Sequence, residues 1–389
     1  MFLWEKKLIN WITEYRHILF FVCISILAFG IRIVGKDFVS ADMSDFLIPW
    51  FDEIKNSGGI SSLDKQTGDY NLLYQTIIAI LTYIPVNCIY LYKILSIIFD
   101  YALAFIAGIV LTDKFSWKTI GLNFNLIYAV VLFIPTVVLN SSFWGQCDSI
   151  YTLFIVLAVF LLYKEKCIMA FIMIGIAFSF KLQTIFIIPF VIALYFYKKK
   201  FSFLNFFVSI IVFELSGIVC FFQGRNILEP FRLYLNQTNT YPSMWLNVAS
   251  FWWLVGNDYS NLKLFAIIVT IFICGVGLYL IMSEKVKIIS LEDYLRVATW
   301  FMWTCILFLP SMHERYTYPL DIFLILLCFI NREYLKYAIY SVCLSTITYS
   351  SFLFANTSID ILMVLLYIFL YVCFSVKVFA QKERIESKS

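Results

Sequence analysis

Four short clusters of polar residues interrupt an otherwise apolar chain, and their side chains suit acid–base chemistry and phosphate binding. The first cluster is the stretch 35–70, which holds seven acidic residues: Asp37, Asp42, Asp45, Asp52, Glu53, Asp64 and Asp69. Pro49 suits the first turn of a short helix and Gly58-Gly59 its end, so Asp45 stands in the turn before that helix. Asp42 lies nearby and could share this environment. A carboxylate in a partly dried site is a reasonable general base for a hydroxyl nucleophile; the alternative is a solvated acidic connector.

The second and third clusters read F-W-G-Q-C-D-S and F-K-L-Q. Trp144 suits a membrane interface, and Gln146 and Asp148 direct polar groups toward the same leaflet. An acidic residue so close to an apolar span, here Asp148, indicates a functional site by default. Lys181 is a point-charge partner for phosphate, with Gln183 close by. The alternative for Lys181 is extension toward the lipid headgroups.

The fourth cluster, M-H-E-R-Y, is flanked by Pro310 and Pro319 and supplies His313, Glu314, Arg315 and Tyr316. His313 and Arg315 could bind a phosphate dianion, and Glu314 could orient either one. Three ionisable groups are costly to desolvate together unless they pair with one another or serve a ligand. Both alternatives stay open. The aromatic and amide residues of 223–258 suit either sugar stacking or an interfacial belt.

The composition predicts that lipid is the solvent for most of the chain. Of 389 residues, 62% are hydrophobic and 14% charged, whereas soluble domains average about 45–50% apolar and about 25% charged. We therefore expect an all-α polytopic membrane protein forming one transmembrane domain over 1–389. The apolar segments predict about twelve spans of roughly 20 residues: 17–34, 87–111, 119–139, 149–163, 167–181, 184–197, 203–222, 261–281, 294–310, 317–331, 336–354 and 359–379. The short apolar segment 72–84 is expected to lie at the outer surface or to re-enter.

Basic residues are concentrated at one set of segment ends, which the positive-inside rule assigns to the cytoplasm. This set is Lys6, Lys7, Arg16, Lys114, Lys118, Lys164, Lys166, Lys198, Lys199, Lys200, Lys285, Lys287, Arg332, Lys336, Lys382, Arg384 and Lys388. Both termini are then cytoplasmic, and large loops at 35–70 and 223–260 are extracytoplasmic. The bias to Phe, Ile, Tyr, Asn and Lys is typical of an AT-rich genome. It favours a bacterium, and hence a bacterial plasma membrane.

Charge and cysteine usage narrow the partners. The net charge of +4 is read as topology rather than nucleic-acid binding. The ten cysteines lie mostly in apolar runs and form no C-x-x-C pair, so neither a disulfide framework nor a zinc site is supported. No cofactor is expected; a divalent metal on the acidic loop is possible but not indicated.

The predicted topology places all four clusters on one side of the membrane. Carboxylates, a lysine and a His-Glu-Arg set there indicate a membrane-delivered, negatively charged substrate, for which a lipid-linked phosphosugar fits. Its phosphate leaving group needs cationic stabilisation and the acceptor hydroxyl needs one base, whereas a glycosidase would need two carboxylates flanking the bond. A flippase or transporter of lipid-linked glycans would explain the phosphate-binding groups, and a glycan polymerase would share much of the chemistry.

The order of the motifs resembles the GT-C superfamily of integral-membrane glycosyltransferases. The match consists of Ser44-Asp45-Phe46, Trp144-Gly145-Gln146 with Asp148, Phe180-Lys181 with Gln183, and His313-Glu314-Arg315-Tyr316. It looks most like mannosyltransferases related to the GPI second mannosyltransferase. It is more distantly similar to the dolichyl-phosphate-glucose glucosyltransferases, whose base is a Gly-Asp-Tyr aspartate. Here Leu182 separates Lys181 from Gln183, which departs from their Phe-Lys-Gln motif.

The resemblance implies a hexosyltransferase that uses a polyprenyl-phosphate sugar and a glycan or lipid-linked acceptor. It implies that Asp45 is the base, with Asp42 as the rival, and that His313 and Lys181 contact the donor phosphate, with Arg315 as a further contact. The remaining polar residues of the motifs are expected to bind sugar or acceptor: Trp144, Gln146, Asp148, Gln183, Glu314 and Tyr316.

Overall fold

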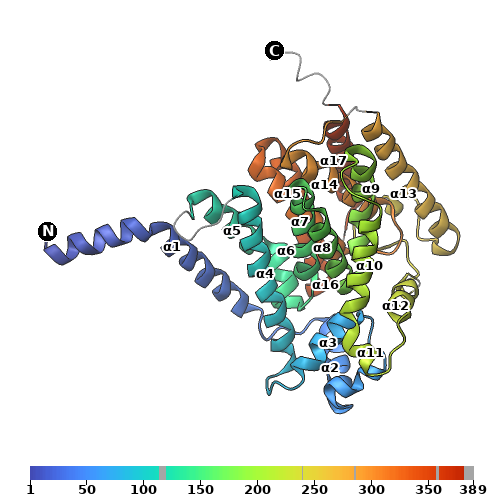
Figure 1. The fold of residues 1–389 in the computed structure, drawn as a ribbon, viewed down its shortest axis with the longest axis horizontal. Helices are drawn as coiled ribbons and strands as arrows, with labels where there is room; N and C mark the ends of the chain where they lie inside the picture. The colour runs from blue at the N-terminus through green and yellow to red at the C-terminus, as the bar shows by residue number, and fades with distance from the viewer. Residues whose placement is uncertain (114–119, 239, 284–285, 356–358, 381–389) are drawn as a thin grey trace.

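The computed structural model describes residues 1–113, 120–238, 240–283, 286–355 and 359–380, and within them the chain is almost entirely helical (Figure 1). The prediction of an all-α fold is confirmed. The α-helices are α1 (Leu3–Val34), α2 (Ile48–Asn56), α3 (Leu72–Leu81), α4 (Cys88–Thr112), α5 (Leu122–Phe133), α6 (Pro135–Val138), α7 (Asp148–Tyr163), α8 (Cys167–Phe180), α9 (Ile188–Lys198), α10 (Leu204–Ser216), α11 (Ile218–Phe222), α12 (Glu229–Gln237), α13 (Tyr259–Met282), α14 (Leu291–Phe308), α15 (Tyr318–Ile330), α16 (Leu335–Phe354) and α17 (Ile361–Phe379).

Shorter elements join these helices at many of their ends. Two are π-helical turns, η1 (Met43–Leu47) and η3 (Leu139–Trp144). The others are 3₁₀ turns: η2 (Gly59–Asp64), η4 (Leu182–Ile187), η5 (Phe251–Leu254), η6 (Glu314–Thr317) and η7 (Arg332–Tyr334). Two short strands, β1 (Trp245–Leu246) and β2 (Met312–His313), pair in parallel.

Among the described residues, five helices are long and apolar enough to cross a membrane: α1, α4, α13, η7 with α16, and α17. The pair formed by α5 and Pro135–Trp144, bent by 55°, adds a sixth if it is one span. This set is compatible with a multi-pass integral membrane protein. Other apolar helices are shorter; α8 has 14 residues, about 21 Å against about 30 Å of hydrocarbon. The count of twelve spans therefore stays a prediction.

Two predicted spans are interrupted, each for a local reason. The segment 119–139 breaks before Pro135, because a residue that precedes proline disfavours helical backbone; Ile134 is extended, with ψ of 136°. The segment 203–222 breaks at Gly217, between α10 and α11. A β-carbon there would lie 2.8 Å from Leu72 Cδ1, so the glycine allows α3 to pack closely against this break.

The acidic stretch 35–70 is compact rather than extended. Pro49 opens α2 as predicted, and Gly58 ends it with φ of +98°, a conformation that favours glycine. The start of the stretch is held by Lys93 of α4, whose Nζ donates to the carbonyl oxygens of Gly35 (2.7 Å), Lys36 (3.1 Å) and Phe38 (2.5 Å). The backbone that leads to Asp42 is thereby attached to α4.

The two stretches predicted to be extracytoplasmic, 35–70 and 223–260, are here named the first and second outer stretches. The second one contacts both the first one and the fourth motif. Arg225 donates to Gln66 (2.5 Å) and to Glu229 (2.6 Å). The strand pairing places Trp245 opposite Met312 and Leu246 opposite His313. Figure 1 shows α2, α3 and α11 at the same end of the helical body. Most of α3 is buried within the fold, and its position at the outer surface of the membrane stays a prediction.

The orientation in the membrane stays a prediction. Several basic residues on which it rests lie outside the described residues: Lys114, Lys118, Lys285, Lys382, Arg384 and Lys388.

A buried ion pair joins α1 to α4. Arg32 donates through Nε (3.0 Å) and NH2 (2.8 Å) to Asp100 Oδ2, and both side chains are 0% exposed. The guanidinium also donates to the carbonyl oxygens of Ala28 (3.1 Å) and Leu132 (3.2 Å). An ionisable group is tolerated in apolar surroundings only while it is paired, so separating Arg32 from Asp100 is costly. The pair therefore holds α1 and α5 against α4.

We expect Arg32→Met to lower the free energy of unfolding by about 3–5 kcal/mol, because it leaves the Asp100 carboxylate buried without its counter-ion. The measurement is the midpoint of thermal unfolding in detergent. The matched control is Arg32→Met combined with Asp100→Leu, which removes both charges and should recover most of the loss. A single variant as stable as the wild type would contradict the structural role of the pair.

Candidate functional site

A cavity of about 400 Å³ lies where all four motifs meet the second outer stretch. The stretch 35–71, the segment 180–186 and the segment 309–316 all contribute lining residues. The lining residues are Asp42, Phe46, Leu47, Trp50, Asp69, Tyr70, Asn71, Gln146, Phe180, Lys181, Leu182, Gln183, Ile185, Phe186, Tyr234, Gln237, Thr238, Thr240, Tyr241, Lys263, Ile267, Leu309, Pro310, Ser311, Met312, Arg315 and Tyr316. Most of this lining is apolar or aromatic, with charged groups from distant segments, as expected of a ligand site.

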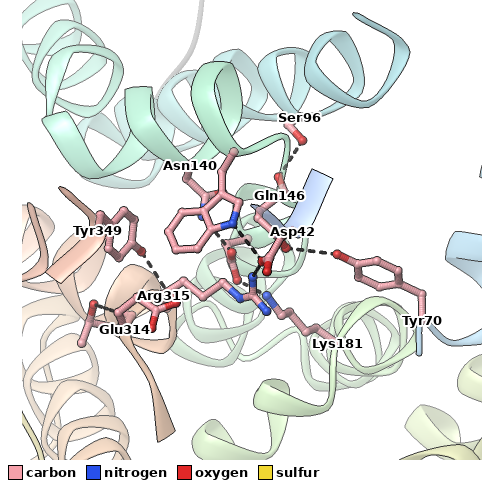
Figure 2. Close-up of polar contacts among 12 residues, drawn as sticks. Asp42, Tyr70, Ser96, Asn140, Gln146, Lys181, Glu314, Arg315 and Tyr349 are labelled. Atoms are coloured by element: carbon pink, nitrogen blue, oxygen red, sulfur yellow. Dashed lines mark hydrogen bonds and ion pairs between the residues drawn. The ribbon is translucent and has the colours of Figure 1, made fainter. Parts of the chain in front are cut away.

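The Asp42 carboxylate is at the centre of the polar contacts (Figure 2). Its Oδ2 accepts hydrogen bonds from Arg315 NH1 (2.5 Å), Trp144 Nε1 (2.9 Å) and Gln146 Nε2 (3.1 Å). No group among the described residues donates to Oδ1, and the side chain is 16% exposed. One oxygen is therefore fixed by three donors while the other stays available to a ligand.

A glycine turn allows Trp144 and Gln146 to reach the same oxygen. Gly145 has φ of +72°, and a β-carbon there would lie 2.6 Å from Met43 Cε. The indole of Trp144 stacks on Phe352, with ring centroids 4.7 Å apart. Gln146 is held at both ends, because Ser96 donates to its backbone oxygen (2.6 Å) and Tyr70 to its side-chain oxygen (3.1 Å).

Lys181 enters the cavity as one member of a second ion pair. Its Nζ donates to Asp148 Oδ1, and Asn140 donates to Asp148 Oδ2 at 2.8 Å. The ammonium also lies near the faces of Tyr151 (5.5 Å) and Tyr316 (5.8 Å). Lys181 is thus a positive group held at the cavity wall, with Asp148 buried behind it as its counter-ion.

The fourth motif divides between the cavity and the surrounding protein. Arg315 and Tyr316 line the cavity, and the Arg315 guanidinium lies 5.5 Å from the Trp144 ring centroid. His313 is outside the lining; its ring packs against Tyr241, with centroids 4.8 Å apart, and Tyr316, at 5.1 Å. Glu314 is buried and also outside the lining.

Burial shifts the pKa of both residues that lie outside the lining, His313 and Glu314. It lowers the pKa of His313 well below its usual value, with a further contribution from the positive charges of Arg315 and Lys181. Burial raises the pKa of Glu314 to about 7. A neutral imidazole supplies no positive charge to a phosphate, so the cationic side chains that line the cavity are Arg315, Lys181 and Lys263.

Six of the predicted site residues line the cavity: Asp42, Gln146, Lys181, Gln183, Arg315 and Tyr316. Trp144 and Asp148 lie directly behind this set and contact it. Asp45, His313 and Glu314 do not line it. Asp45 is exposed and accepts a hydrogen bond from Ser44 at 2.8 Å. The geometry therefore favours Asp42 over Asp45, because Asp42 alone of the two lines the cavity.

Asp69 also lines the cavity, although the sequence analysis assigned it no role. Burial raises its pKa, and Gln237 donates to its backbone oxygen. Tyr70 and Tyr241 were likewise not singled out as ligand-contacting residues.

Among the described residues, no group of three or more His, Cys, Asp or Glu is arranged to hold a metal ion. A search of family models and of curated proteins found no match to this chain.

Glu314→Gln tests the electrostatics of the fourth motif. Between its unfolded pKa of about 4.3 and its folded pKa of about 7, the folded chain keeps the proton that the unfolded chain releases. The stabilisation is therefore complete below pH 4 and lost as the pH rises through 7, by an amount on the order of 3 kcal/mol.

We expect the midpoint of thermal unfolding in detergent to fall between pH 5 and pH 8. The fall should be larger for the wild type than for Glu314→Gln. The exposed Asp45→Asn variant should follow the wild type. Parallel behaviour of Glu314→Gln and the wild type would contradict the protonated state of Glu314.

Proposed function

We propose that this chain is an inverting glycosyltransferase. It moves a hexose of the mannose or glucose type from a polyprenyl-phosphate donor to a hydroxyl of a glycan or lipid-linked acceptor at the extracytoplasmic face. The proposal includes a GT-C-like fold with about twelve spans, in which the shorter apolar helices also traverse the bilayer as part of the bundle.

The observation that carries the proposal is the geometry of Asp42. One carboxylate oxygen is held by Arg315, Trp144 and Gln146, in a cavity that also presents Lys181. This arrangement supplies one base and two cations, which is the set that transfer from a sugar phosphate needs. It supports Asp42 as the base, in place of the Asp45 that the resemblance implies.

In the proposed reaction, Asp42 Oδ1 accepts the proton of the acceptor hydroxyl. The hydroxyl oxygen attacks C1 of the donor sugar from the face opposite the phosphate, so the anomeric configuration inverts. The bond between C1 and the phosphate oxygen breaks, and its electron pair leaves with the phosphate. Fixing Oδ2 by three donors lets Oδ1 keep its direction throughout the step.

Arg315 and Lys181 stabilise the charge that develops on the leaving phosphate. To reach it, Lys181 exchanges part of its contact with Asp148 for a phosphate oxygen. Gln146, Gln183 and Tyr316 provide hydrogen-bonding groups for sugar or acceptor hydroxyls. Glu314 and His313 act through packing behind this set. Trp144 contacts both Asp42 and Arg315 and holds them in position relative to each other.

A second candidate function, a flippase or transporter of lipid-linked glycans, is favoured by features away from the cavity. Such proteins place ionisable residues within the bundle and use interrupted helices. Arg32, Asp100 and Asp321 are fully or almost fully buried, and α5 is followed by a 55° bend. The two candidates predict different products from the same lipid-linked sugar.

The decisive experiment incubates the purified chain in nanodiscs with labelled polyprenyl-phosphate mannose and glucose, with a lipid extract as acceptor. We expect Asp42→Asn to lower transfer by about 10²–10⁴-fold, because it removes the base, while donor binding is retained. Asp45→Asn is the matched control, and it should keep most of the activity because Asp45 is exposed and outside the cavity.

Loss of transfer in Asp45→Asn or in Asp69→Asn, with Asp42→Asn active, would reassign the base. Absence of transfer from either donor, together with movement of labelled lipid between leaflets of vesicles, would overturn the transferase proposal and support the flippase.

A further inference from the structure

Helix α1 is longer than a membrane crossing requires. Its 32 residues correspond to about 48 Å, against about 30 Å of hydrocarbon. The charged side chains of its first half, Glu5, Lys6, Lys7, Glu14 and Arg16, are incompatible with the bilayer centre. The apolar segment 18–34 is long enough to occupy most of the hydrocarbon layer. The first half of the helix must therefore lie outside that layer.

None of the other described helices surrounds this first half. Figure 1 shows it extending away from the other helices, and every residue of 1–16 except Glu5 is exposed. Its exposed side chains are nevertheless not those of a solvated helix, because Trp, Leu, Ile and Tyr alternate with charged and amide residues.

Five of the large apolar residues form a stripe along this half of the helix, whereas Phe2, Leu3 and Ile9 lie off it. Trp4, Leu8, Trp11 and Tyr15 follow one another at spacings of four, three and four, which places them on one face, and Ile12 lies beside them. We call these five residues the aromatic stripe; their exposed fractions are 64% for Trp4, 48% for Leu8, 49% for Trp11, 45% for Ile12 and 39% for Tyr15. The same periodicity places Lys6, Asn10, Thr13 and His17 on the opposite face.

We propose that the first half of α1 lies in the plane of the membrane interface as an amphipathic anchor helix. The aromatic stripe is buried among the headgroups and the upper acyl chains. The opposite face, which carries Lys6, Asn10, Thr13 and His17, is in water. This proposal rests on the apolar spanning segment of α1 and does not depend on the catalytic proposal.

Phospholipid fits this stripe better than another protein does. The stripe continues directly into a helix segment suited to lipid. Trp and Tyr are the residues enriched at membrane interfaces, whereas the seam of a helix dimer favours Leu, Ile and Val. Three basic and two acidic side chains between residues 5 and 16 give a net charge of +1. Binding should therefore rest on apolar burial and depend little on anionic lipid.

The test places the photoreactive residue p-benzoylphenylalanine at Trp11 of the full chain in phosphatidylcholine vesicles. After illumination we expect covalent adducts with lipid, detected by mass spectrometry. Their yield should change little when phosphatidylglycerol is added or salt is raised. The matched control places the same residue at Thr13, on the opposite face, where the lipid adducts should be lost.

Equal lipid adducts at Trp11 and Thr13 would overturn the proposal, and so would cross-links between two copies of the chain at Trp11. A second measurement uses the double variant Trp4→Glu with Trp11→Glu. We expect faster amide hydrogen exchange across residues 4–16 and unchanged exchange in α4, since the stripe contacts lipid and not the fold. Unchanged exchange in 4–16 would equally overturn the proposal.

Discussion

The ion pair between Asp42 and Arg315 joins segments that are 273 residues apart in the chain, and the arrangement of the cavity depends on it. Asp42 comes from the first outer stretch, whose backbone Lys93 attaches to α4. Arg315 belongs to η6, where the hydroxyl of Tyr349 on α16 donates to its backbone oxygen at 3.3 Å. Trp144 contacts both partners from a third segment. Three parts of the fold therefore meet through one carboxylate oxygen.

The same physical rule recurs at three further ion pairs. Arg32 is paired with Asp100, Lys181 with Asp148, and Arg225 with Glu229. A buried charge without a partner costs several kcal/mol, so each pair restricts how neighbouring helices can be placed. Between α1 and α4, the Arg32–Asp100 pair restricts how the two helices pack. At the cavity it fixes the side chains that a ligand would meet.

Sequence patterns predicted the helices well because apolar runs bounded by Pro, Gly and charged residues leave few alternatives. They also predicted that Gln146, Lys181 and Arg315 share one site. They could not separate Asp42 from Asp45, because the two lie in one loop and their directions follow from packing against α4 and η3. Nor could they give the charge of His313, since its burial comes from residues distant in sequence, such as Tyr241.

The pairing of Lys181 with Asp148 and of Arg315 with Asp42 matches two of the cavity's cations with resident carboxylates. Under the proposed function, the donor is a phosphodiester with one negative charge, and the lipid product is a phosphomonoester that carries up to two. Unshielded cations would hold this product more tightly than the donor. Two resident carboxylates compete for the same cations and weaken that preference. Under that function, Asp148 would in this way favour release of the product.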